Sequence, residues 1–327
     1  MRPPGLKPAP RPGLFRQTPP AIFPALFGLF GLGLAWRQAV MTFGVPSAIP
    51  ETYLGAVSLL FLFCVLAYGA KAARRPAVVV EDMRTLPGRA GVSALSIGVL
   101  LLAVVLVPYD RGAARGLLYL GLALHGLIAV LFIGVLATGP SEQRMVTPAW
   151  HLTFVGFVLV PLSALPLGLY DLGLWVFYAM WLAAGAIYAV SLRQLVQRDP
   201  PPPLRPLLAI HLAPPSVLGM VALLLEQVSL AAWLAGFAAL ILAALVLHAR
   251  YLTVAGFSAL WSAFTFPSAA LTALCLGLAG ATGWGVFRLA GAVLLVVVTF
   301  MIPLIAYKVL QAWARGVLGP KTNAAIA

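Results

Sequence analysis

Ten apolar runs fill the greater part of this chain, and they constrain its fold more than any other feature. A helix needs about 20 mainly apolar residues to cross a bilayer. Runs of roughly this length occupy residues 20–37, 53–72, 91–109, 115–138, 149–169, 172–194, 206–225, 228–249, 253–279 and 283–313. Charged residues make up only 9% of the chain, whereas about a quarter is usual in a soluble domain. The sequence therefore predicts an all-α membrane protein with ten transmembrane helices.

The basic residues are distributed unevenly between the two sides of these runs. The net charge of +13 would suggest nucleic-acid binding in a soluble chain. Seventeen of the 21 Lys and Arg residues, however, lie in the termini and in alternate loops; the other side has only Arg37, Arg111, Arg115 and Arg288. Because cytoplasmic loops are enriched in Lys and Arg, we expect cytoplasmic termini and no nucleic-acid partner. Residues 1–18 are predicted to be a disordered cytoplasmic tail and 314–327 a second tail, flanking a channel domain at 19–313.

Short connections and prolines organise the ten runs. The outward turns between the later runs are only a few residues long, so neighbouring helices are expected to pair as five antiparallel hairpins. Interior or near-interior prolines of the odd-numbered runs are Pro24, Pro161, Pro166, Pro214, Pro215 and Pro267, whereas the even-numbered runs contain only Pro303, in the tenth. A proline breaks the backbone hydrogen bonds of a helix, and broken helices at membrane depth are tolerated where they line a cavity.

We therefore predict that the odd-numbered helices kink and line a central pore, with Gly98 as the bend of the third helix. The even-numbered helices would then form the outer layer. The alternative is that these prolines only relieve packing, because proline is common in membrane helices.

The segment Phe264-Thr265-Phe266-Pro267 places two aromatic rings directly before a proline in the ninth run. An aromatic side chain at a kink inside a pore would act as a plug. Residues two positions apart point about 200° apart around a helix, so Phe264 and Phe266 cannot both face the axis.

Few side chains in the runs can carry chemistry. His125 is expected to be a buried histidine bonded to a neighbour, whereas His211, one turn before Pro214, is a candidate to face the cavity. An anion would otherwise meet backbone dipoles at helix breaks and hydroxyl groups, of which the candidates are Thr153, Ser163, Ser216, Thr265 and Ser268. The sequence has no carboxylate pair, metal-ligand cluster, phosphate loop or nucleophile motif, so no enzyme activity, metal or cofactor is expected.

Four segments in odd-numbered runs resemble the tellurite-resistance/dicarboxylate transporter family, which includes TehA-like bacterial proteins and plant guard-cell slow anion channels. They are Phe23-Pro24-x3-Gly28-x2-Gly31-x4-Trp36, Thr147-Pro148-Ala149-Trp150, Arg205-Pro206-x3-Ile210-x-Leu212-Ala213-Pro214-Pro215 and Trp261-x2-Phe264-Thr265-Phe266-Pro267. The resemblance covers about residues 16–313. It departs from the family at Thr153, where a proline is common, and at Pro24, where glycine is usual.

The resemblance implies five hairpins with quasi-fivefold symmetry around a central pore, and a homotrimer in the bacterial inner membrane. It also implies that Phe266 is the pore gate. Further candidates to line the pore are Gly28, Gly98, Phe264, Thr265 and His211. Family members pass small anions such as chloride and nitrate, or carry C4-dicarboxylates, sulfite or tellurite.

Three functions remain open from the sequence. The first is a passive anion channel closed by Phe266. The second is a proton-coupled carrier or exporter of a C4-dicarboxylate, sulfite or tellurite, with His211 as the proton-sensitive group. The third is a membrane scaffold or sensor without ion flux.

Overall fold

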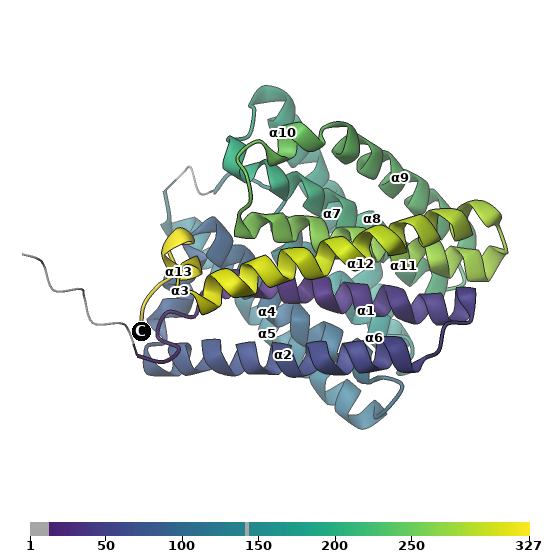
Figure 1. Ribbon diagram of the computed structural model, residues 1–327, viewed down its shortest axis with the longest axis horizontal. Coiled ribbons are helices and arrows are strands. Elements are labelled where there is room, and N and C mark those ends of the chain that lie inside the picture. Colours follow the sequence, from purple (N-terminus) through teal and green to yellow (C-terminus); the bar gives the residue numbers. More distant parts are fainter. Residues whose placement is uncertain (1–12, 141–143) are drawn as a thin grey trace, which may run out of the picture.

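The computed structural model describes residues 13–140 and 144–327, and the regular elements of this part of the chain are all helices, without strands (Figure 1). Nine of its helices are long and apolar enough to cross a membrane. The prediction of an all-helical, multi-pass membrane protein is therefore confirmed.

The long helices fall into an inner and an outer group. In their most apolar stretches the outer helices bury only 22–33% of their residues, whereas the inner helices bury 72–83%. The outer helices are α2 (Ala48–Arg74), α5 (Arg111–Thr138), α7 (Tyr170–Gln197), α9 (Val228–Leu247) and α12 (Gly285–Ala314). The inner helices are α1 (Phe23–Phe43), α4 (Leu86–Leu106), α8 (Ala213–Leu224) and α11 (Thr265–Thr282). The inner helices belong to odd-numbered runs of the sequence, and the outer ones to even-numbered runs.

The predicted fifth span, 149–169, differs from a single transmembrane helix. It consists of a π-helical turn η3 (His151–Val155), a 3-10 turn η4 (Gly156–Leu159) and the short helix α6 (Val160–Ala164). In an α-helix the N–H of residue 161 would donate to the carbonyl oxygen of residue 157. Pro161 has no N–H, so this hydrogen bond cannot form. The apolar stretch His151–Ala164 is thus a shorter, broken inner segment beside the nine long helices.

The inner segments contact one another in chain order. Helix α1 packs against α4, α4 against η4 and α6, α6 against α8, α8 against α11, and α11 back against α1. Each outer helix packs against the inner segment that precedes it in the chain, and α12 also lies across α1, as Figure 1 shows. This arrangement leaves the apolar outer faces of α2, α5, α7, α9 and α12 exposed, as a helix facing lipid requires.

Three further inner segments begin with a 3-10 stretch. These are η1 (Pro20–Ile22) before α1, η5 (Pro202–Leu212) before α8 and η6 (Ala259–Phe264) before α11. Pro24, Pro161, Pro214, Pro215 and Pro267 all lie in the first turn of the α-helix that follows such a stretch. Because first-turn N–H groups have no partner within the helix, a proline there costs no hydrogen bond. The positions at which the sequence predicts kinks thus coincide with changes of helix type.

The two ends of the described chain meet at the end of the molecule where the inner segments begin. There the short helices α3 (Ala77–Met83), between α2 and α4, and α13 (Leu318–Lys321) lie close to the C-terminus (Figure 1). The backbone N–H of Ala327 donates to the carbonyl oxygen of Arg16 at 3.1 Å. The predicted C-terminal tail, 314–327, therefore packs on the helices, whereas most of the predicted N-terminal tail, residues 1–12, lies outside the described residues.

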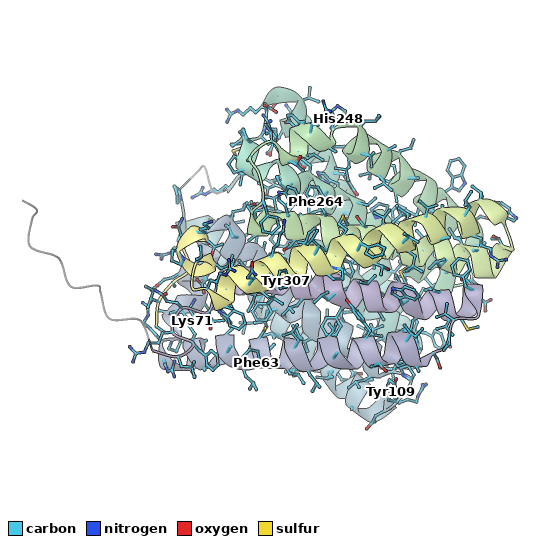
Figure 2. All side chains as sticks on the ribbon, in the orientation of Figure 1. Phe63, Lys71, Tyr109, His248, Phe264 and Tyr307 are labelled. Atoms are coloured by element: carbon cyan, nitrogen blue, oxygen red, sulfur yellow. The ribbon has the colours of Figure 1, made fainter. Side chains whose placement is uncertain are left out.

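A fully buried ion pair holds this end together. Lys71 Nζ lies 2.8 Å from Asp82 Oδ2, and both side chains are 0% exposed. Tyr68 donates its hydroxyl to the same carboxylate, which also accepts the N–H of Ala325 at 2.7 Å. Lys71 donates as well to the carbonyl oxygen of Thr18, just before α1. Figure 2 places Lys71 at this end of the molecule and Tyr109 at the opposite end.

One more helix, α10 (Ala249–Thr253), links α9 to η6 on the side of η5.

Candidate functional site

Three cavities follow one another inside the ring of inner segments. The first, which we call the N-end cavity, is lined by residues near the start of each inner segment, including Pro24, Pro87, Leu152, Ile210 and Phe266. The second, the middle cavity, lies further along the same segments, beside residues such as Ile97, Val158 and Val217. The third, the C-end cavity, is lined near their far ends by residues that include Leu34, Val104, Leu162, Met220 and Ala273.

The order of the cavities can be read along single helices. On α4, Ala90 borders the N-end cavity, Ile97 the middle cavity and Val104 the C-end cavity. Seven residues of α-helix advance about 10 Å, so the three cavities lie in a row. Their volumes are about 40, 30 and 370 Å³. A cavity needs at least about 10–15 Å³ to hold a water molecule, so the first two are narrow and the third is wide.

Two phenylalanine rings stand where the N-end and middle cavities adjoin. Phe27 of α1 and Phe266 of α11 line both cavities. Their rings stack with centroids 3.7 Å apart and an angle of 18° between the planes. We refer to Phe27 and Phe266 as the aromatic pair. The sequence analysis names Phe266 as the expected pore gate, but it does not identify Phe27 as the ring that stacks on it.

Glycines of α1 let α11 approach closely enough for this stacking. A Cβ atom at Gly31 would lie 2.9 Å from the Phe266 ring, and one at Gly28 only 2.1 Å from Thr265 Oγ1. Contacts that short do not occur in stable packing, so both positions require glycine as long as the helices keep their separation. Gly28, which the sequence analysis names as a candidate to line the pore, lies in the α1–α11 contact.

Gly28→Ala is therefore expected to destabilise the protein by about 1–3 kcal/mol, because the new methyl group forces α1 away from α11. Thermal unfolding of the purified protein in detergent would measure the loss. Gly126→Ala is the matched control: Gly126 is also inside a helix, and its added Cβ would meet nothing within 4 Å. If both variants unfold at the same temperature, the close α1–α11 contact is contradicted.

The remaining predicted lining residues occupy different positions. Gly98 packs against the ring of Phe61, which a Cβ atom would approach to 2.6 Å. Thr265 is fully buried and donates its hydroxyl to the carbonyl of Ser262 at 2.7 Å. Phe264, which Figure 2 places midway along the molecule, directs its ring to Trp261, with centroids 5.9 Å apart.

A histidine pair connects the middle cavity to an outer groove. His151 Nε2 lies 3.1 Å from His211 Nδ1, and His211 Nε2 lies 3.1 Å from Ser191 Oγ. His151 lines the middle cavity, whereas His211 borders a groove of about 350 Å³ between α7, η5, α9 and α10. His211, the candidate from sequence, thus approaches the cavity only through His151, which the sequence did not single out.

Tyr188 fixes His211 from the other side by donating its hydroxyl to the backbone carbonyl of His211. This carbonyl would normally accept a backbone N–H from position 214 in a 3-10 helix or 215 in an α-helix. Both positions are proline, so a side-chain donor is needed there. His125, by contrast, bonds to Ser96 Oγ at 2.8 Å inside the α4–α5 packing, as the sequence predicts.

Two polar atoms that line the narrow cavities have no hydrogen-bond partner in the described structure, Ser262 Oγ and His151 Nδ1. Both residues are 3% exposed. A buried polar group without a partner costs about 1–3 kcal/mol. By contrast, the hydroxyls expected from sequence are engaged: Ser163, Ser216, Thr265 and Ser268 donate to backbone carbonyls, and Thr153 bonds to Ser93.

Arg37, in the wide C-end cavity, is the one charged side chain that lines these three cavities in the described part of the chain. Its guanidinium group pairs with both carboxylate oxygens of Glu51, at 2.7 and 2.6 Å, and donates to the carbonyl of Val105. Tyr109 also donates to Glu51, and this hydrogen bond raises the pKa of Tyr109, which stays neutral. The C-end cavity therefore contains a positive charge, on Arg37, that Glu51 largely compensates.

The chain was compared with known proteins and protein families. A family model described as voltage-dependent anion channel matches residues 17–310, a range that takes in every inner segment and most of α12. No curated protein matches the chain.

Proposed function

The chain belongs to the voltage-dependent anion channel family, and from this premise we propose that it passes small anions, such as chloride or nitrate, across a membrane. The family includes TehA-like bacterial proteins and plant slow anion channels. Its members are channels or transporters rather than enzymes. We propose further that the ion path runs through the N-end, middle and C-end cavities.

The observation that carries this proposal is the row of cavities inside the closed ring of inner segments. The cyclic contacts of five inner segments, each backed by one outer helix, support five hairpins with quasi-fivefold symmetry. Cations crossing a pore usually require acidic side chains along it. Within residues 13–140 and 144–327, no Asp or Glu lines these three cavities, which favours anions.

The aromatic pair is the proposed gate. Its stacked rings stand between the N-end and middle cavities, where the space for water is smallest. An apolar constriction blocks ions because an ion cannot shed its water without compensation. An otherwise weakly polar path favours rapid passage over tight binding, as a passive channel requires.

The setting of the channel is proposed from the sequence. The bias of Lys and Arg supports cytoplasmic termini, so the N-end cavity would open towards the cytoplasm. The resemblance to TehA-like proteins supports a location in the bacterial inner membrane and a homotrimeric assembly. The family that the chain resembles also includes proteins linked to tellurite resistance.

Reversal potentials in planar bilayers test the proposal. With purified protein and a potassium chloride gradient, the current should reverse near the equilibrium potential of chloride. Replacing chloride by gluconate on one side should shift the reversal potential, and a pH gradient should leave it unchanged. A reversal potential that follows potassium, or uptake that saturates and requires a proton gradient, would contradict a passive anion channel.

A further inference from the structure

The N-end and middle cavities share one chemical feature. Among the residues that the structure describes, Ser262 is the only polar side chain that lines the N-end cavity, and His151 is the only one that lines the middle cavity. The polar atom of each, Ser262 Oγ and His151 Nδ1, is buried without a hydrogen-bond partner. Native proteins rarely leave buried polar atoms unpaired, and those that remain call for a ligand or water.

These two groups stand on either side of the aromatic pair. Ser262 lies on η6, directly before α11, and Phe266 follows it by four residues. His151 lies on η3 and borders the middle cavity together with Phe27 and Phe266. An ion that passes the rings would leave one of these groups and meet the other.

The hydroxyl of Ser262 is free to donate because no acceptor among the described residues takes its proton. Hydroxyl groups inside helices commonly donate to the carbonyl three or four residues earlier. Ser216 and Ser268 do so, to Leu212 and Phe264. In the 3-10 stretch η6, Ser262 makes no such bond in the described structure.

The histidine pair can present a donor at the same time. If Ser191 donates to His211 Nε2 and His211 Nδ1–H donates to His151 Nε2, the proton of neutral His151 must be on Nδ1. The reverse order of donors would leave a lone pair on Nδ1. An anion in the middle cavity selects the first arrangement, because it is attracted by an N–H and repelled by a lone pair.

We infer that Ser262 and His151 form two neutral anion-binding positions, one on each side of the aromatic pair, that replace part of the water lost by a small inorganic anion. This inference rests on the proposed function. Neutral donors bind an anion without trapping it, since no opposite charge has to be left behind. The two positions also favour compact ions such as chloride, whose dehydration costs most, over larger ones such as nitrate.

Conductance measurements test both positions, in a Phe266→Ala background so that the ring does not limit the current. Ser262→Ala and His151→Phe should each raise the half-saturating chloride concentration about tenfold, the effect of losing one hydrogen bond to a charged group. Both should also increase the nitrate-to-chloride permeability ratio. Ser262→Thr and His151→Gln, which keep a donor, should restore values near those of the background.

Matched controls are Ser216→Ala and His125→Phe. Ser216→Ala removes a hydroxyl whose proton is already bonded. His125→Phe removes a histidine that bonds to Ser96 and that lines none of the three cavities, although its Nε2 also has no partner in the described structure. If Ser262→Ala and His151→Phe behave like these controls while the background still conducts anions, the two binding positions are wrong and the channel function stands. If the background conducts no anions, the channel function itself is wrong.

Nitrogen-15 NMR of the protein in liposomes reads the binding position at His151 without any current. The chain has four histidines, so the His151 signals can be assigned with the His151→Phe variant. Adding chloride should shift the tautomer of His151 towards a protonated Nδ1 and leave the signals of His125 unchanged. No chloride-dependent change at His151 would overturn its role whatever the conductance.

Discussion

Replacing Phe27 and Phe266 together by alanine is expected to raise the anion conductance at least about tenfold. This factor corresponds to a barrier lowered by about 1.4 kcal/mol. The two rings stack on each other and line both narrow cavities, so their removal joins these cavities into one wider passage. Water can then accompany the ion, and the cost of dehydration falls. Single-channel recording in planar bilayers measures the change.

The single variants separate the contributions of the two rings. Phe266→Ala removes the ring next to Pro267, but the Phe27 ring remains in the passage. The anion conductance should therefore increase less than in the double variant. Phe264→Ala should leave the current nearly unchanged, because its ring faces Trp261. Equal increases from Phe264→Ala and Phe266→Ala, with normal assembly, would contradict the gate.

Phe27 shows why half of the aromatic pair escaped prediction. The resemblance identifies Phe266 through the Thr-Phe-Pro segment, and nothing in the sequence pairs it with a residue of the first run. The stacking depends on how closely α1 approaches α11, which follows from Gly28 and Gly31 lying against Thr265 and Phe266. Glycines on one helix indicate that another helix packs closely against it, but they do not identify which helix that is.

The general architecture, in contrast, follows from patterns that act over many residues. Apolar length predicts the helices, and the concentration of prolines in odd-numbered runs indicates the inner group, although the outer helix α12 also contains a proline, Pro303. The broken segment His151–Ala164 is the exception, because the choice between α, 3-10 and π geometry depends on which donors reach each carbonyl.

Ser262 and His151 escaped prediction for a related reason. The sequence analysis selected hydroxyls by residue type and by their place in odd-numbered runs, yet a hydroxyl can donate to a ligand only if its proton is not already donated. Thr265 and Ser268 donate theirs within the helix, and Ser262 does not. This difference depends on local backbone geometry, which residue type alone does not specify.

Asp82→Asn is expected to destabilise the protein by about 3–5 kcal/mol, the usual effect of breaking a buried ion pair. The substitution leaves Lys71 charged and fully buried, with only the Thr18 carbonyl and a neutral amide as acceptors. It also weakens the acceptor for Tyr68 and for the N–H of Ala325, which ties the C-terminal segment to α3. The loss should appear as a lower unfolding temperature in detergent and a lower yield of folded protein.

Two further variants show whether burial is the cause. Arg75 and Glu81 form a similar pair close by, but their side chains are 43% and 36% exposed, so Glu81→Gln should cost at most about 1 kcal/mol. Lys71→Met combined with Asp82→Leu removes both charges and should recover part of the stability lost in Asp82→Asn. If Asp82→Asn and Glu81→Gln are equally mild, the buried pair is not what fastens the two ends of the chain to the start of α1. If instead the double variant recovers stability, the uncompensated Lys71 charge accounts for the loss.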